Sequence, residues 1–236
     1  MQRVLNQLVE RLEKAFGDGI ASVVLYGSAA VGDHHGRYSD INVLCVLKRI
    51  TPRELAACEG VFRWWRELGN PAPLLLSEDE LRTSTDCFPI EFHDIKERHR
   101  ILAGANLVAD LEVDDAFYRA QVEHELRAKL LRLRQKAGGV LSDKHLLLEL
   151  MLDSVSTFCM LARHALRLSG FEAGFEKREI VKEAAGRLGL DPAPFHTLLD
   201  VRERRIKPRE VDSAALFERY LKEIGTVVDA VDRLER

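Results

Sequence analysis

A Gly-Ser pair and an Asp-x-Asn triplet are the residues of this sequence whose types and spacing point most directly to chemistry. Both lie in the segment VVLYGSAAVGDHHGRYSDINVLCVL, residues 23–47. Gly27-Ser28 ends one apolar run, and Asp40 and Asn42 open the next. This order predicts a strand, a tight turn, a short helix and a second strand. Because alternate residues of a strand project from one face, Asp40 and Asn42 are expected to lie side by side.

The turn has the features of an anion site. Gly27 has no Cβ, so its backbone can turn sharply and approach a ligand closely. Ser28 can cap the following helix or offer its hydroxyl to a phosphate. Backbone N–H groups at a helix start favour anions such as a triphosphate. Arg37 precedes Asp40 closely enough to reach a phosphate, although a solvated loop arginine is the alternative.

The Asp-x-Asn triplet has the oxygen atoms that Mg²⁺ prefers as ligands. Asn42 keeps a side-chain oxygen but lacks the negative charge of an aspartate. One unit charge at contact range is worth about 4 kcal/mol at an effective dielectric near 20. The site could therefore bind one metal ion, bind metal only together with nucleotide, or bind none.

A third acid is expected near residue 90. The segment from 88 to 95, FPIEFHDI, resembles a strand in which Glu91 stands between Ile90 and Phe92. By alternation His93 would share the face of Glu91, and Asp94 would not. We take Glu91 as the third acid and Asp94 as the second choice. A half-exposed strand with ordinary solvated acids is the alternative.

Composition narrows the function classes. The 236 residues are enough for one large or two small domains with real cores. A net charge of −3 gives no overall attraction to nucleic acid, and no apolar run approaches the ~20 residues of a membrane span. We therefore expect neither a nucleic-acid nor a membrane partner. Four isolated cysteines indicate reduced thiols and a cytoplasmic protein.

The patterns change near residue 110. Residues 1–109 mix helical and strand signals, including a capped helix start at Thr51-Pro52 and a capping box from Ser77 to Glu80. Residues 110–236 show helical periodicity only, with an unusually apolar helix expected over 142–169 and capped by Ser142. The sequence thus predicts an α/β domain followed by a bundle of four or five helices, an α+β fold overall. A homodimer is left open.

The Gly-Ser pair, its spacer and the Asp-x-Asn triplet closely resemble the signature of the polymerase-β-like nucleotidyltransferase superfamily, with Asn42 in place of a second aspartate. With a helical C-terminal half, the chain is similar to bacterial aminoglycoside nucleotidyltransferases and related predicted nucleotidyltransferases. The resemblance implies a mixed sheet flanked by helices and triphosphate held at Gly27 and Ser28. It implies Mg²⁺ at Asp40, Asn42 and Glu91, with Asp40 and Glu91 catalytic. The nucleoside triphosphate would give its monophosphate to a hydroxyl of a small molecule or protein.

Two other classes of function stay open. Asn42 could mark a nucleotide-binding or regulatory protein that has lost its metal chemistry. The helical half could instead be an interaction or toxin-type module, since Arg119 and His124 loosely match the Arg-to-His spacing of helical ribonucleases of the HEPN type. Fold alone does not choose among these classes. The acceptor, the nucleotide and the oligomeric state are not given by the sequence.

Overall fold

The structure is a computed structural model that describes residues 1–31 and 41–234. The chain divides into two compact units, Met1–Phe117 and Tyr118–Arg236. Each unit has its own set of elements, and each is described separately below.

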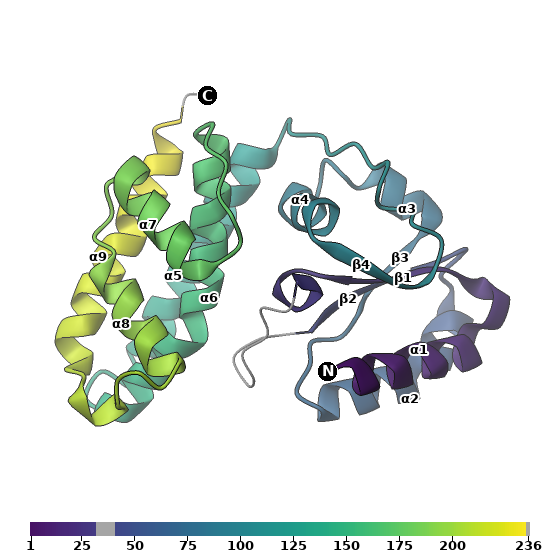
Figure 1. Ribbon diagram of the computed structural model, residues 1–236, viewed down its shortest axis with the longest axis horizontal. Coiled ribbons are helices and arrows are strands. Elements are labelled where there is room, and N and C mark those ends of the chain that lie inside the picture. The colour runs from purple at the N-terminus through teal and green to yellow at the C-terminus, as the bar shows by residue number, and fades with distance from the viewer. Residues whose placement is uncertain (32–40, 235–236) are drawn as a thin grey trace. The chain divides into compact units, whose positions relative to one another are not determined.

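The first unit is a four-stranded mixed sheet with helices on both faces (Figure 1). The strand order is β3-β2-β1-β4; β1 is antiparallel to both neighbours, whereas β2 and β3 are parallel. The strands are β1 (Ile20–Tyr26), β2 (Asn42–Leu47), β3 (Leu74–Ser77) and β4 (His99–Gly104). The helices are α1 (Gln2–Phe16), α2 (Pro52–Glu67), α3 (Glu78–Thr83) and α4 (Pro89–Glu97), with 3₁₀ turns at Gly17–Gly19 and Ser28–Val31.

The two faces of the sheet follow from strand alternation. Val23, Leu25 and Val43 point to one face, where they pack with the apolar stripe of α1 and with Trp65 of α2. Val24 and Leu44 point to the other face, which α3 and α4 cover. Each face therefore has its own apolar core.

Local signals explain where several elements begin. Thr51 and Glu54 form a complete capping box at the start of α2, with Pro52 in its first turn. Ser77 and Glu80 do the same for α3. Both predicted helix starts are confirmed.

The segment 88–95 was expected to be a strand, and this expectation is wrong. Residues Pro89–Glu97 form helix α4, with Pro89 in the first turn, where its missing N–H costs nothing. The edge of the sheet beside β1 is occupied instead by β4, which the sequence did not reveal. At the end of β4, Gly104 has a φ of +77°, and a Cβ there would lie 2.3 Å from the carbonyl oxygen of Ala21. Only glycine allows this close approach.

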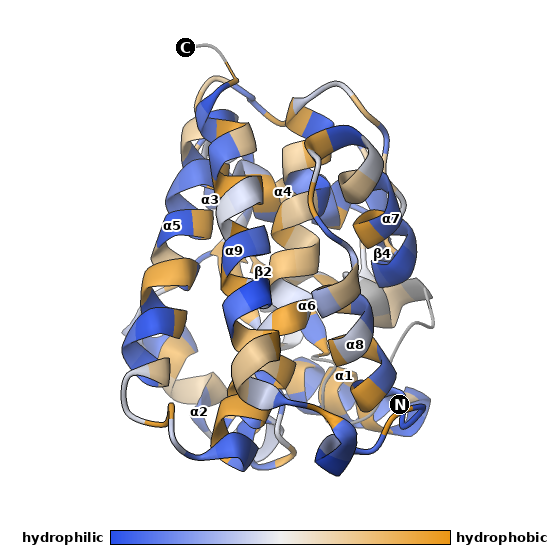
Figure 2. Cartoon of the chain, turned by 90° about the vertical axis from the view of Figure 1, so that its left-hand side faces the viewer, coloured by the Kyte–Doolittle hydropathy of each residue, from blue (hydrophilic) through white to orange (hydrophobic). Residues whose placement is uncertain are grey.

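The second unit is a bundle of helices, and its described residues, 118–234, contain no strand. The helices are α5 (Tyr118–Ala137), α6 (Lys144–Leu168), α7 (Lys177–Leu188), α8 (Ala193–Arg202) and α9 (Ser213–Asp232). Figure 2 shows hydrophilic and hydrophobic bands on α5 and α9, as expected for bundle helices with one buried side. The α+β fold is therefore confirmed.

Helix α6 is the central helix of this bundle. It buries thirteen of its 25 residues, more than any other helix among the described residues, as its apolar sequence predicts. Its cap is Asp143, which accepts hydrogen bonds from the N–H groups of His145 and Leu146, and not the expected Ser142. Among the described helices, α6 alone is long and apolar enough to cross a membrane by length and composition, and half of its most apolar window is already buried within the protein.

Candidate functional site

The Gly27 turn and Asn42 lie together because β1 and β2 pair in register. Tyr26, the last residue of β1, is opposite Asn42, the first residue of β2. The next residue, Gly27, has a φ of +74°, and its N–H donates to the carbonyl oxygen of Arg98 over 3.2 Å. A Cβ at Gly27 would lie 3.5 Å from Nδ2 of Asn42. The Asn42 amide is therefore directly beside the glycine turn, as the spacing of the motif predicts.

The same register determines which face of the sheet the site occupies. Asn42 alternates with Leu44 and therefore projects toward the face that α4 covers. Tyr26 packs against the apolar core of that same face. Asp40 and Arg37 lie outside the described residues, so their roles stay predictions.

Glu91 and Asp94 come to this end of β1 from helix α4. Burial is the largest of the causes that raise the pKa of the Tyr26 phenol to about 12, and the negative charges of Glu91 and then Asp94 contribute to the same rise. An electrostatic effect of this kind requires both carboxylates to be near Tyr26. The expected acid thus lies near the phenol of Tyr26, the residue before Gly27, although it is carried by a helix and not by a strand.

The helix also changes which residues share a side with Glu91. At 100° per residue, Glu91 and Asp94 lie on one flank of α4, whereas His93 lies on the opposite flank. The strand-based expectation that His93 shares the face of Glu91 is therefore wrong. Asp94, the second choice by sequence, therefore lies beside Glu91, the first choice.

His99 is a neighbour of the site that sequence reasoning missed. It is the first residue of β4 and is opposite Tyr26 in the sheet. Its Nδ1 lies 2.9 Å from the carbonyl oxygen of Ile95, which can only accept, so Nδ1 carries the proton. The free Nε2 then accepts from Nδ2 of Asn106 over 3.3 Å. Only the strand pairing of β4 places this histidine, and no local pattern marks it.

The donor atoms around the turn suit a hard cation. Asn42, Glu91 and Asp94 all have side-chain oxygens, which Mg²⁺ prefers over nitrogen or sulfur. Within residues 1–31 and 41–234, however, no group of three or more histidine, cysteine or acidic side chains is arranged to hold a metal ion. Because Asp40 is outside that range, the expected metal set of Asp40, Asn42 and Glu91 stays a prediction.

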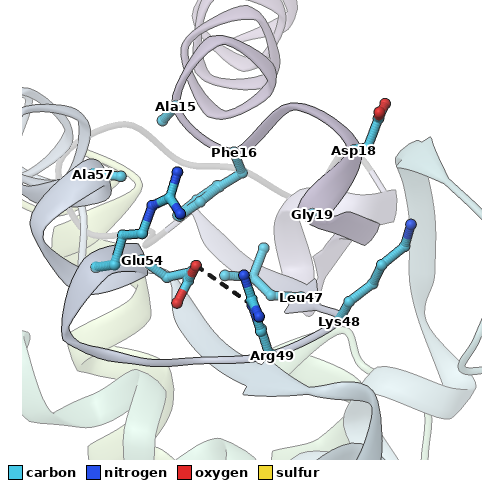
Figure 3. Close-up of a pocket in the computed structure, with 10 residues that line it drawn as sticks. Ala15, Phe16, Asp18, Gly19, Leu47, Lys48, Arg49, Glu54 and Ala57 are labelled. Atoms are coloured by element: carbon cyan, nitrogen blue, oxygen red, sulfur yellow. Dashed lines mark ion pairs between the residues drawn. The ribbon is translucent and has the colours of Figure 1, made fainter.

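A pocket of about 480 Å³ lies at the opposite ends of β1 and β2 (Figure 3). It is lined by the junction of α1 and β1, including Phe16 and Gly19, and by the residues after β2, including Arg49. Glu54 in this pocket is engaged by the capping box and by Arg49 at 3.9 Å. With the seven residues of β1 between them, this pocket and the Gly27 turn are about 20 Å apart. It is therefore not part of the candidate site.

In the helical unit, the loose Arg-to-His match has an ordinary structural explanation. Nη1 of Arg119 pairs with the carboxylate of Glu123 over 2.9 Å, one turn along α5. His124 is exposed on the same helix. This pairing is an ordinary contact between half-buried side chains one turn apart on a helix and gives no support to a ribonuclease site.

Comparison with known sequences places the protein in a class. Residues 5–135, more than half of the 236, match the nucleotidyltransferase domain family, and the chain belongs to this family. No curated protein matches the chain significantly.

One solved structure with a similar fold is that of spectinomycin adenyltransferase AAD(9) from Enterococcus faecialis, determined with ATP and spectinomycin. Its TM-score is 0.59 at 11% sequence identity, over 98% of this chain and 99% of that chain. At this identity the likeness establishes the fold alone. It extends over nearly the whole length of both proteins.

Proposed function

We propose that this protein transfers a nucleoside monophosphate from a nucleoside triphosphate to a hydroxyl group of a small molecule. The observation that carries the proposal is the position of Asn42 beside the Gly27 turn, with the carboxylates of Glu91 and Asp94 acting on the neighbouring Tyr26, in a chain of the nucleotidyltransferase family. The match to the family favours transfer over a binding protein without activity.

Each group has a role in this proposal. The Gly27 backbone would approach the triphosphate, since the residue has no Cβ and its φ is positive. Asn42, Glu91 and Asp40 would hold Mg²⁺, which screens phosphate charge when bound. The acceptor hydroxyl would give its proton to a carboxylate of the α4 pair, for which Glu91 is our choice. The hydroxyl oxygen would then bond to the α-phosphorus, and pyrophosphate would leave.

A small acceptor is proposed because the structurally similar adenyltransferase was solved with spectinomycin, a small molecule, and covers this chain almost end to end. The identity is too low to carry over the acceptor itself. An acceptor panel for the experiment should therefore include aminocyclitols, amino sugars and simple polyols.

The experiment measures nucleotide binding first and turnover second. Calorimetry with a nonhydrolysable ATP analogue and Mn²⁺ tests binding, and pyrophosphate release with the acceptor panel tests transfer. Glu91→Gln should lower turnover by roughly 10²–10⁴-fold, the usual contribution of a general base. Glu13→Gln is the matched control, because Glu13 is exposed on α1 at the other face of the sheet.

Asn42→Asp distinguishes an active site with a weakened metal site from a binding protein. An added carboxylate should raise Mg²⁺ affinity in the presence of nucleotide, and turnover should stay or rise. If the wild-type protein binds no nucleotide in the presence of metal, the proposed function is wrong. If it binds nucleotide and Glu91→Gln behaves like Glu13→Gln, the assignment of Glu91 is wrong.

A further inference from the structure

Helix α4 is held from the side opposite to its two acids. Phe92 and Ile95 point into the sheet core, and Glu91 and Asp94 lie on one flank of the helix. The other flank carries His93 and Lys96. A shift or rotation of α4 on the sheet would therefore move Glu91 relative to the Gly27 turn.

The His93–Lys96 flank is bound by the connecting segment, which we define as residues 105–117, between β4 and α5. Nε2 of His93, a buried side chain, lies 2.6 Å from Oδ1 of Asp115. Nζ of Lys96 donates to the carbonyl oxygen of Leu111 over 2.6 Å. These are two short, charge-assisted contacts on one flank, spaced one helical turn apart.

The connecting segment is itself fixed to the sheet. Val108 and Leu111 are buried in the same core as Phe92, and the N–H of Ala105 donates to the carbonyl oxygen of Ala21. Next to Asp115, the carboxylate of Asp114 accepts from the N–H of Ala116 over 2.8 Å and so stabilises the local turn. The segment can therefore act as a fixed support and not only as a connection.

We propose that His93 and Asp115 are positioning residues, which hold α4 so that Glu91 and Asp94 lie at the Gly27 turn. The proposal deepens the proposed function, since it concerns how the acids of that same site are placed. Neither residue would touch substrate. The effect would be transmitted through the rotation and position of α4.

Asp115→Ala is the decisive variant because the Asp115 side chain is 57% exposed, so its removal should leave the fold intact. It should lower kcat by roughly 10- to 100-fold, since displacement of a reacting group by about 1 Å has effects of this size. KM for the nucleotide should change less than kcat. Asp115→Asn keeps an oxygen that can accept from His93 and should restore most of kcat.

A second readout does not need activity. The ring resonances of Tyr26 and the side-chain amide resonances of Asn42 report directly on the end of β1 near α4. In NMR spectra these signals should shift in Asp115→Ala and return in Asp115→Asn. Asp110→Ala, at an exposed acid of the same segment, is the control and should leave the signals and kcat unchanged.

Each result has a definite meaning. If Asp115→Ala and Asp110→Ala are indistinguishable in the NMR spectra, the proposal is overturned, whether or not the protein is active. If Asp115→Ala lowers kcat and thermal stability together without shifting Tyr26, the contact is merely structural, which also overturns it. If the wild-type protein shows no transfer but Tyr26 and Asn42 shift as expected, the proposed function fails while the positioning of α4 stands.

Discussion

Replacing Gly27 by alanine tests both the geometry of the turn and its role in nucleotide binding. With a φ of +74°, alanine would pay the cost of a left-handed backbone, about 1–2 kcal/mol. The added Cβ would lie 3.5 Å from Nδ2 of Asn42, an ordinary van der Waals contact. No steric cost is added, so the free energy of unfolding should fall by about 1–2 kcal/mol.

Two other glycines of the same unit serve as comparisons. Gly69 has a φ of +84° and nothing within 4 Å of an added Cβ, so Gly69→Ala should have a similar cost. Gly104 has a φ of +77°, but its added Cβ would lie 2.3 Å from the carbonyl oxygen of Ala21. The backbone must move to relieve that contact, which should add about 1–3 kcal/mol.

Guanidinium unfolding followed by tryptophan fluorescence measures these differences, because both tryptophans, Trp64 and Trp65, lie on α2 of the first unit. Calorimetry with an ATP analogue then separates stability from function. Gly27→Ala should weaken nucleotide binding by at least about tenfold (about 1.4 kcal/mol), whereas Gly69→Ala should not. If Gly27→Ala binds nucleotide like the wild type, the turn does not approach the triphosphate and our reasoning about the site is refuted.

Two further predictions concern polar side chains of β1, the partly buried Tyr26 and the fully buried Ser22. Burial is the main cause that raises the pKa of Tyr26 to about 12, above its ordinary value near 10. The neutral phenol therefore contributes fully to the free energy of unfolding below pH ~10, and this contribution is lost as the pH rises toward 12. Two pKa units correspond to about 2–3 kcal/mol, so Tyr26→Phe should lose less stability than the wild type between pH 9 and 12. Equal losses in the two proteins would contradict the raised pKa of Tyr26. The hydroxyl of Ser22 is fully buried and has no hydrogen-bond partner within the described part of the chain. Ser22→Ala should therefore leave the melting temperature unchanged or raise it, and a clear decrease would show that the hydroxyl is satisfied.

Local sequence patterns predicted the elements whose residues fit one period or carry a clear capping signal. Residues 23–26 and 43–47 are apolar runs, and they form most of the central strands β1 and β2. Capping boxes at Thr51 and Ser77 start helices where the side chains can satisfy free N–H groups. The long apolar run in α6 forms the most buried helix of the bundle.

The segment around Glu91 could not be assigned from its sequence because a short apolar run fits two periods. Ile90 and Phe92 alternate as in a strand, whereas Phe92 and Ile95 are spaced as on a helix. In the structure the place beside β1 is occupied by β4, and the segment around Glu91 is a helix with Pro89 in its first turn. That strand begins His99-Arg100 and is only half-buried at the edge of the sheet, so it has no clear apolar pattern.

The chemistry of the site divides in the same way. The glycine turn and the position of Asn42 beside it follow from a spacing that two paired strands translate directly into contact. The nearness of Glu91 and Asp94 to Tyr26 does not follow from sequence spacing, because it depends on how α4 lies on the sheet. On a strand these two acids would point to opposite faces, but on a helix they share one flank. Their joint placement is therefore a property of packing, in which Phe92 and Ile95 fix one side of the helix in the core and the contacts from Leu111 and Asp115 fix another.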